Sequence, residues 1–167
     1  VCAFAECAVT GGAAAIRSCG VEKTEYIINH IQLPVIGLTK SHFDDGFVRI
    51  TGSFAEVEQL IAIHTPLIAV DGTFRQREGG LTGPEYIRAI KQRYAGVSIM
   101  ADISTVEEAV ACREAGADCV STTLCGYTPQ TAEESKHGPS VEMLKRCVEA
   151  LPGCPVFAEG RYNTPVE

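Results

Sequence analysis

Short runs of nearly continuous hydrophobic residues alternate along the chain with segments in which hydrophobic residues recur at helical spacing. A run that is apolar at both odd and even positions is typical of a parallel strand buried on both faces. The pattern predicts strands over residues 13–18, 34–40, 66–72, 97–104, 118–124 and 155–160. Helices are predicted between them, over residues 53–64, 83–94, 104–118 and 139–153.

Residues at the ends of these segments support the helix predictions. Ser53 stands before the first predicted helix with Glu56 three positions later, which is the pattern of a capping box. Pro84 lies near the start of the second helix, and Gly116 lies near the end of the third. The opening residues, VCAFAECAVTGG, are small and apolar and indicate the middle of a further helix.

Strands and helices that alternate without interruption indicate parallel strands joined by crossover connections. Arg17 lies near the end of the first predicted strand and Glu159 near the end of the last. The five strand-to-strand intervals between them average about 28 residues. This is close to the length of one unit in a TIM-type (β/α)8 barrel of roughly 250 residues. An open doubly wound sheet usually carries a glycine-rich phosphate loop after its first strand, and no such loop occurs in the sequence. We therefore expect an α/β fold of the barrel type.

The length of the chain bears on how much of a barrel it contains. At 167 residues it is too short for eight such units. It begins without Met and stops where another helix should begin. We therefore expect a single (β/α) barrel domain over residues 1–167, truncated at both ends, with strands two to seven present and the first and eighth units missing.

Composition and charge narrow the possible functions. Hydrophobic residues make up 46% of the chain and charged residues 21%, as in a folded protein rather than a disordered one. The net charge of −7 does not favour binding to nucleic acid or to an anionic membrane surface. No run of about 18 apolar residues is present, so we expect no membrane span. A local cluster of cations could still bind a small anionic substrate.

The cysteines and histidines give no sign of a metal site. The chain has eight Cys without a C-x-x-C pair, and several lie in apolar runs. We interpret them as buried, reduced thiols of a cytoplasmic protein. The four His residues lack metal-ligand spacing, so no metal is expected.

Polar residues end several predicted strands, and in a barrel these ends converge on one mouth. Lys40 closes the run PVIGLTK, where an amine should be partly desolvated. Desolvation lowers an ammonium pKa and lets a lysine act as a base. Glu159 ends PVFAEG and suits a general acid/base carboxylate. The alternatives are a solvated surface charge for Lys40 and a structural ion pair for Glu159.

Further strand-end residues suit the binding of a polar ligand. Arg17 lies among small residues, where a buried guanidinium needs an anion, either a protein carboxylate or a substrate phosphate. Asp71 and Asp102 could each cap the following turn or helix. Ser104 or Thr105 already offers a cap after Asp102, which leaves Asp102 free to accept a hydrogen bond from a sugar hydroxyl.

The segment STTLCGYT carries hydroxyls and backbone amides at another strand end. Thr122, Thr123 and Tyr127 suit sugar or phosphate oxygens there, although the segment could also be only a tight turn. Gly160 would let a ligand approach the backbone closely. The charged segment FRQREGG over residues 74–80 carries no specific signal.

Taken together, these motifs resemble the N-acetylmannosamine-6-phosphate 2-epimerase family of sialic-acid catabolism. The matching motifs cover residues 8–166 and are AAIRSCGV, PVIGLTK, FVRIT, IAVDGT, ADIST, EAGAD, STTLCGYT and AEGRYNTP, in the family's order. AEGRYNTP and TTLxGYT are the most specific of them. The resemblance implies a TIM-barrel isomerase that interconverts N-acetylmannosamine 6-phosphate and N-acetylglucosamine 6-phosphate without a cofactor, typically as a homodimer.

The resemblance also implies roles for individual residues. Lys40 would be the catalytic acid/base and Glu159 its acidic partner, while Arg17, Asp102 and Arg161 would hold the substrate. These roles agree with the chemistry, because epimerisation at carbon 2 requires a proton to be removed next to a carbonyl, so the sugar ring must first open. A carboxylate can assist the opening, an amine can take the proton, and polar donors can stabilise an enediol-like intermediate.

The chain departs from the family pattern in several places. The polar first strand with its Gln and the eighth strand with its Gly-rich phosphate loop have no counterpart in the sequence. Ser41 and His42 follow the lysine where Arg-Asp is common, and IRSCG replaces a more usual IRIEG. Two alternatives stay open: another phosphate-binding barrel isomerase or aldolase, in which Lys40 forms a Schiff base, and a truncated, inactive sugar-phosphate-binding form.

Overall fold

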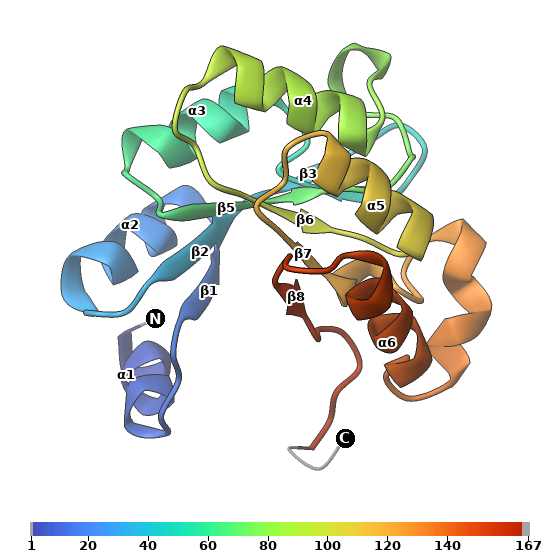
Figure 1. Ribbon diagram of the computed structural model, residues 1–167. Coiled ribbons are helices and arrows are strands. Elements are labelled where there is room, and N and C mark those ends of the chain that lie inside the picture. The colour runs from blue at the N-terminus through green and yellow to red at the C-terminus, as the bar shows by residue number, and fades with distance from the viewer. Residues whose placement is uncertain (1, 165–167) are drawn as a thin grey trace.

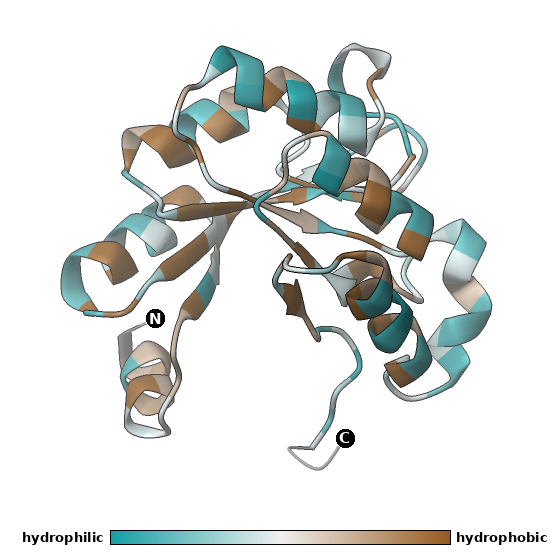
Figure 2. Ribbon diagram, viewed as in Figure 1, coloured by the Kyte–Doolittle hydropathy of each residue, from teal (hydrophilic) through white to brown (hydrophobic). Residues whose placement is uncertain are grey.

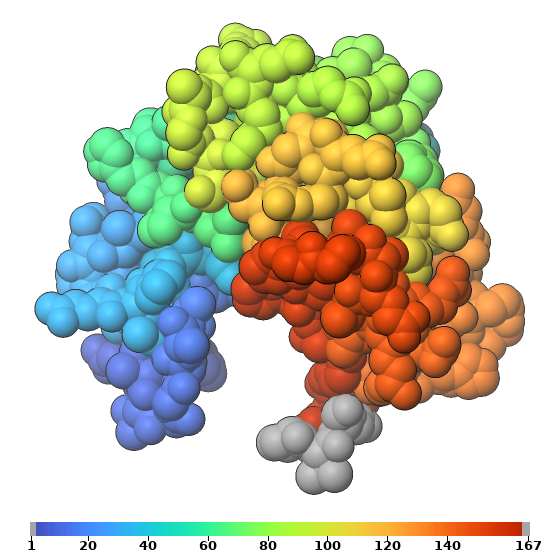
Figure 3. Space-filling model, in the orientation of Figure 1, coloured from blue at the N-terminus to red at the C-terminus, as the bar shows by residue number. Residues whose placement is uncertain are grey.

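The computed structural model describes residues 2–164 as a parallel sheet that curls into an open arc, with helices on its convex side (Figure 1). The six strands are β1 (Ile16–Cys19), β2 (Val35–Leu38), β5 (Leu67–Asp71), β6 (Ile99–Asp102), β7 (Cys119–Ser121) and β8 (Val156–Phe157). Their order in the sheet is their order along the chain, and all neighbours are parallel. The predicted strands and their parallel arrangement are confirmed. A hollow separates the two ends of the arc (Figure 3).

Helices precede β1 and connect the strands that follow. They are α1 (Cys2–Thr10), α2 (Val21–His30), α3 (Phe54–Ala62), α4 (Gly83–Arg93), α5 (Val106–Glu114) and α6 (Val141–Ala150). Three short 3-10 segments, η1 (Glu78–Gly80), η2 (Thr122–Leu124) and η3 (Pro129–Lys136), lie in the connections. The sequence pattern missed α2, because this helix buries only Thr24 and Ile27 and has no continuous apolar stripe.

A hairpin interrupts the connection from β2 to α3. Its strands, β3 (Lys40–His42) and β4 (Val48–Ile50), are antiparallel and pair only with each other. The strand predicted over residues 34–40 is therefore too long, since β2 ends at Leu38 and Lys40 begins β3. The backbone amide of Thr51 donates to the carbonyl of Thr39 at 3.0 Å, which closes the base of the hairpin.

The predicted helix boundaries are confirmed at two positions. Ser53 and Glu56 form the expected capping box at the start of α3. Gly116 follows the C-terminal end of α5 with a φ of +108°, which glycine adopts at no steric cost, and its amide donates to the carbonyl of Arg113 at 3.0 Å. Such caps satisfy backbone groups that a helix end would otherwise leave unpaired.

Apolar side chains pack on both faces of the sheet. On the convex face, the strands pack against the apolar sides of the helices, which turn their hydrophilic sides outward (Figure 2). A smaller cluster fills the concave face and contains Ile36, Leu38, Ile50, Ala69, Met100 and Cys119. The nearly continuous apolar runs of the sequence follow from this burial on two sides.

The register of the strands brings the polar strand-end residues onto the concave face. Asp71 is aligned with Asp102, Asp102 with Ser121, and Ser121 with Phe157. Side chains of aligned residues in neighbouring strands point to the same face. Glu159 lies two residues beyond Phe157, so a continued alternation places it on that face as well.

The described cysteines are free thiols, but they are not all buried as expected. Cys112, Cys119, Cys125 and Cys147 are buried, whereas Cys7 and Cys19 are exposed because α1 and β1 lie at an open end of the arc. Within residues 2–164, no helix is both long enough and apolar enough to cross a membrane.

Close packing between two glycines predicts a stability effect. A Cβ added at Gly83 would lie 2.4 Å from the carbonyl carbon of Gly72, a contact that only a backbone shift can relieve. We expect Gly83→Ala to lower the free energy of unfolding by about 1–3 kcal/mol, the usual cost of overpacking. Urea denaturation would measure this loss. Gly138→Ala is the control, because a Cβ there meets no atom within 4 Å, and an equal effect of both changes would contradict the prediction.

Candidate functional site

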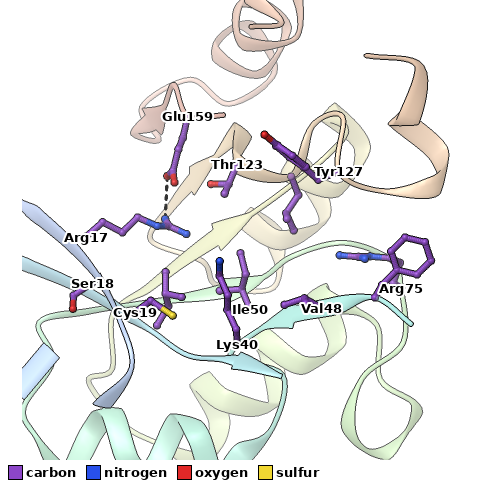
Figure 4. A pocket seen from close by; sticks show the side chains of 13 residues that line it. Arg17, Ser18, Cys19, Lys40, Val48, Ile50, Arg75, Thr123, Tyr127 and Glu159 are labelled. Carbon is purple, nitrogen blue, oxygen red and sulfur yellow. Dashed lines mark ion pairs between the residues drawn. The ribbon is translucent and has the colours of Figure 1, made fainter. Parts of the chain in front are cut away.

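A pocket of about 610 Å³ opens on the concave side of the sheet, where the strands end (Figure 4). Its charged lining residues are Arg17, Lys40, Arg75 and Glu159. Leu38, Val48, Ile50 and Leu124 form an apolar part of the lining. The pocket thus combines a few charged groups with an apolar wall, which is the usual composition of a small-molecule site.

Arg17 is the central charge of the site. From β1, its Nη2 lies 2.6 Å from Asp102 Oδ2 at the end of β6. Its Nη1 lies 3.1 Å from Glu159 Oε2, beyond β8, and Figure 4 marks this ion pair. The anion that the sequence required for Arg17 is therefore supplied by two protein carboxylates. One guanidinium joins three separate segments of the chain.

Burial shifts the pKa of both members of the Arg17–Asp102 pair. The Asp102 side chain is fully buried, which raises the pKa of its carboxyl to about 6 although Arg17 and a hydrogen bond from Thr123 oppose that rise. Burial acts to lower the pKa of Arg17, but the neighbouring Asp102 and Glu159 carboxylates outweigh it and leave this pKa raised. Near neutral pH the pair is therefore ionised.

Hydrogen bonds from the end of β7 hold Glu159. Ser121 Oγ donates to Glu159 Oε2 at 3.1 Å. Thr122 Oγ1 donates to the Glu159 carbonyl at 2.9 Å and accepts from the Glu159 amide at 3.0 Å. Thr122, an expected substrate contact, is buried and its hydroxyl is bound to the backbone of Glu159, and it is not among the residues that line the pocket. Its neighbour Thr123 lines the pocket instead and donates to Asp102 Oδ1 at 2.8 Å.

Lys40 reaches the pocket from the hairpin. In Figure 4 its amine and the Glu159 carboxylate approach the cavity from opposite sides. The Lys40 side chain is exposed, so the expected partial desolvation is wrong for this structure. The reason is that β2 ends before Lys40, which places the lysine on a two-stranded hairpin at the wide opening of the pocket rather than inside the sheet.

The other predicted residues lie around the turn that follows Glu159. Gly160 has a φ of +95°, and a Cβ there would lie 3.2 Å from the carbonyl oxygen of Thr123, so glycine is needed for this turn. Arg161 is not among the residues that line this pocket, and it donates to the carbonyl of His137 at 3.0 Å. Tyr127 lines the pocket and is 56% exposed. Pro165, in the AEGRYNTP motif, lies outside the described residues.

Arg75 is a pocket residue that the sequence did not indicate. Its Nη2 lies 2.7 Å from Asp71 Oδ2, and its Nε donates to Thr73 Oγ1 at 3.0 Å. Asp71 also accepts from the amide of Thr73 at 3.0 Å, so its turn-forming interpretation is confirmed. The spacing of four residues between Asp71 and Arg75 was the available signal, but it does not reveal that the loop folds back over the pocket.

Among residues 2–164, no cluster of three or more His, Cys, Asp and Glu side chains could hold a metal ion. The polar groups that line the pocket are an amine, two guanidinium groups, one carboxylate, hydroxyls and a thiol. Such groups can exchange protons and bind oxyanions.

The family comparison gives this arrangement a context. The family model described as N-acetylmannosamine-6-phosphate epimerase matches residues 1–167. The chain belongs to this family. The family resemblance inferred from the sequence motifs is thereby confirmed.

Individual members of the epimerase family match over nearly the whole chain. A protein of Clostridioides difficile named as an N-acetylmannosamine-6-phosphate 2-epimerase is 43% identical over 162 residues, which are 97% of this chain and 70% of that protein. One of Caldanaerobacter subterraneus with the same name is 39% identical over 164 residues, 98% of this chain and 68% of that protein. The solved structure of the 2-epimerase from Clostridium perfringens superimposes with a TM-score of 0.87 at 39% identity, covering 98% of this chain and 69% of that one.

The raised pKa of Asp102 predicts a pH dependence of stability. Between its ordinary value of 3.8 and about 6, the folded state binds more of this proton than the unfolded state does. The free energy of unfolding should therefore fall as pH rises through that window. Urea denaturation from about pH 4 to about pH 7, compared with Asp102→Asn, isolates the effect because the variant lacks this titration. The unfolding free energy of the unmodified protein minus that of Asp102→Asn should fall as pH rises through this window. A rise of this difference with pH would contradict the raised pKa of Asp102.

Proposed function

We propose that this protein interconverts N-acetylmannosamine 6-phosphate and N-acetylglucosamine 6-phosphate by removing and returning the proton at carbon 2. Membership of the epimerase family supports this function. The observation that carries it in the structure is that Lys40 and Glu159 line one pocket together with the Arg17 guanidinium. A base, an acid and a cation are the groups that this reaction needs.

Ring opening is the first step, and Glu159 is the group suited to it. Opening requires a proton to move from the hydroxyl on carbon 1 to the ring oxygen, which produces the open-chain aldehyde. The Glu159 carboxylate is partly exposed to the pocket and oriented by Arg17 and Ser121, so it can carry this proton. Its backbone is fixed by Thr122, which limits its freedom to turn away.

Proton removal follows at carbon 2 of the open chain. Lys40 takes the proton, and the electrons of the C–H bond move toward the aldehyde to form an enolate whose carbon 2 still carries the acetamido group. Arg17, which lines the pocket, can stabilise the negative oxygen, a contribution that is usually large. A proton then returns to the opposite face of carbon 2, either from the Lys40 ammonium after exchange with solvent or from a second acid that recovers its proton from that ammonium through solvent. This gives the epimer and leaves Lys40 as the neutral amine again.

The charges of the pocket suit an anionic sugar. Arg17, Lys40 and Arg75 bring three cations to a molecule whose overall charge is −7. Asp102 is ion-paired with Arg17, and Asp71 with Arg75, so neither carboxylate is an uncompensated negative charge near the pocket. Tyr127, which lines the pocket, and the turn at Gly160 and Arg161 are proposed as further substrate contacts.

We also infer that the arc is part of a (β/α)8 barrel. The six strands of the sheet, β1, β2 and β5 to β8, then correspond to the second to seventh strands of one barrel domain. The parallel order, the curl and the apolar cluster on the concave face support this assignment. The similar epimerase structure is longer, and this chain covers 69% of it. A homodimer, independence from cofactors and a cytoplasmic location belong to the same proposal and rest on the family resemblance.

A deuterium exchange assay tests the reaction and the role of Lys40. N-acetylmannosamine 6-phosphate is incubated with the protein in deuterium oxide and followed by NMR. We expect N-acetylglucosamine 6-phosphate with deuterium at carbon 2, because the abstracted proton is replaced from solvent. Lys40→Ala should lower this exchange by a factor of about 10² or more, the usual contribution of a general base.

Two outcomes of that assay would overturn the proposal. If the protein shows no exchange, or if Lys40→Ala exchanges as fast as the unmodified protein, Lys40 does not transfer the proton. Borohydride treatment in the presence of substrate separates the aldolase alternative, because only a Schiff base on Lys40 would be trapped covalently.

The Glu159→Gln variant separates catalysis from structure. Glutamine keeps the shape of the side chain and the acceptor for Ser121, but it cannot exchange the ring-opening proton. We expect turnover to fall by about 10² or more, with a much smaller loss of unfolding free energy. Steady-state kinetics and urea denaturation of the same preparation measure the two effects, and parallel losses would favour a purely structural ion pair.

A further inference from the structure

Glu56, in the first turn of α3, binds the residues on both sides of Lys40. Thr39 Oγ1 donates to Glu56 Oε1 at 2.7 Å. Ser41 Oγ donates to Glu56 Oε2 at 2.5 Å. Hydrogen bonds to a charged carboxylate are stronger than those between neutral groups. One side chain therefore fixes the backbone that carries Lys40 at two points, one residue before the lysine and one residue after it.

We call the two hydrogen bonds from Thr39 and Ser41 to Glu56 the clamp. The Glu56 carboxylate is itself held by further hydrogen bonds. Glu56 Oε2 accepts from the amide of Ser53 at 3.0 Å and from the Ser53 hydroxyl at 2.9 Å, as part of the capping box of α3. Val57, the next residue of the helix, and Leu60, one turn further along, are fully buried in the core that packs on the sheet. The clamp thus connects the hairpin to a helix that the hydrophobic core holds in place.

Apart from Glu56, the backbone beside Lys40 is held mainly by hydrogen bonds between Thr39 and Thr51 at the base of the hairpin. Strand β3 has three residues and pairs only with β4, with Lys40 aligned to Ile50. Two-stranded hairpins are marginally stable on their own. The lysine side chain is exposed, so packing does not fix its direction. The position of its amine therefore depends on how firmly the backbone at residues 39–41 is held.

We infer that Glu56 is a positioning residue for Lys40. Through Thr39 and Ser41 it sets where the amine stands relative to carbon 2 of the substrate. This inference rests on the proposed function, in which Lys40 takes the proton. Misplacement of a reacting group by about 1 Å can cost a factor of about 10² in rate. Binding of the substrate should change little, because Arg17, Glu159 and Arg75 remain in place.

The chain offers a matched control in Glu85, in the first turn of α4. Glu85 Oε2 accepts from the amide of Thr82 at 2.8 Å and from the Thr82 hydroxyl at 2.6 Å, so it forms the same capping box. In the part of the chain that the structure describes, Glu85 makes no hydrogen bond to residues 39–41. Glu56→Ala and Glu85→Ala each remove a helix cap, but only Glu56→Ala also removes the clamp.

A complementary variant removes the clamp and leaves the cap. The double substitution Thr39→Val and Ser41→Ala deletes both hydroxyls that donate to Glu56, while Ser53 and Glu56 keep their capping box. Glu56→Gln is the conservative variant. It keeps one carbonyl acceptor for Thr39 or Ser41 and should restore part of the activity.

The experiment measures turnover and KM for N-acetylmannosamine 6-phosphate by NMR in all four variants, with urea denaturation in parallel. We expect Glu56→Ala and the double variant to lower kcat by about 10- to 100-fold with KM changed less than about twofold. Glu85→Ala should keep the kcat of the unmodified protein despite a similar loss of stability. Equal kcat in Glu56→Ala and Glu85→Ala, or a fall in kcat that only follows stability, would overturn the inference.

Amide hydrogen exchange separates this inference from the proposed function. Exchange of residues 39–42, followed by mass spectrometry, should speed up in Glu56→Ala and in the double variant but not in Glu85→Ala. If the unmodified protein does not convert the substrate, the proposed function fails, while the exchange data still show whether Glu56 holds the Lys40 segment. Unchanged exchange in both clamp variants would overturn the inference whatever the activity.

Discussion

The structure depends on one guanidinium placed between two carboxylates. Arg17 on β1 binds Asp102 at the end of β6 and Glu159 beyond β8, so it connects both ends of the curled sheet. Asp102 is fully buried, and removal of its partner would leave an uncompensated charge, a loss that typically costs about 3–5 kcal/mol. The same guanidinium therefore stabilises the arc through Asp102 and orients the proposed acid through Glu159.

This arrangement explains how much of the fold the sequence could predict. Strands such as β5 were found because their residues are buried on both faces, which leaves an unbroken apolar run. The hairpin was missed because β3 is polar and only three residues long, and its partner β4 follows a turn. The polar strand β3 is held by pairing with β4 and by Glu56, neither of which leaves a hydrophobic pattern.

The site could be predicted in part for a similar reason. Arg17, Asp102 and Glu159 lie together because the strands of a parallel sheet end at one edge, a rule that needs no side-chain detail. Thr122 and Thr123 belong to the 3-10 turn η2 that follows β7, so which of them faces the pocket depends on the geometry of this turn, which the sequence does not display. Arg161 lies in a turn with a φ of +63°, so its direction follows from backbone geometry that the sequence does not display.

The starts of the helices shape the pocket as much as the ends of the strands. Glu108, in the first turn of α5, accepts from the amide of Ser104 at 2.8 Å and from the amide of Phe74 at 3.0 Å. It thereby holds the loop that carries Arg75, as Glu56 holds the hairpin that carries Lys40. Both carboxylates belong to capping boxes, whose bonds fix the first turn of a helix. The helix holds the backbone of a first-turn glutamate, and its carboxylate can accept several hydrogen bonds. Such a residue can therefore hold a nearby loop in place where the loop has few apolar residues to pack into the core.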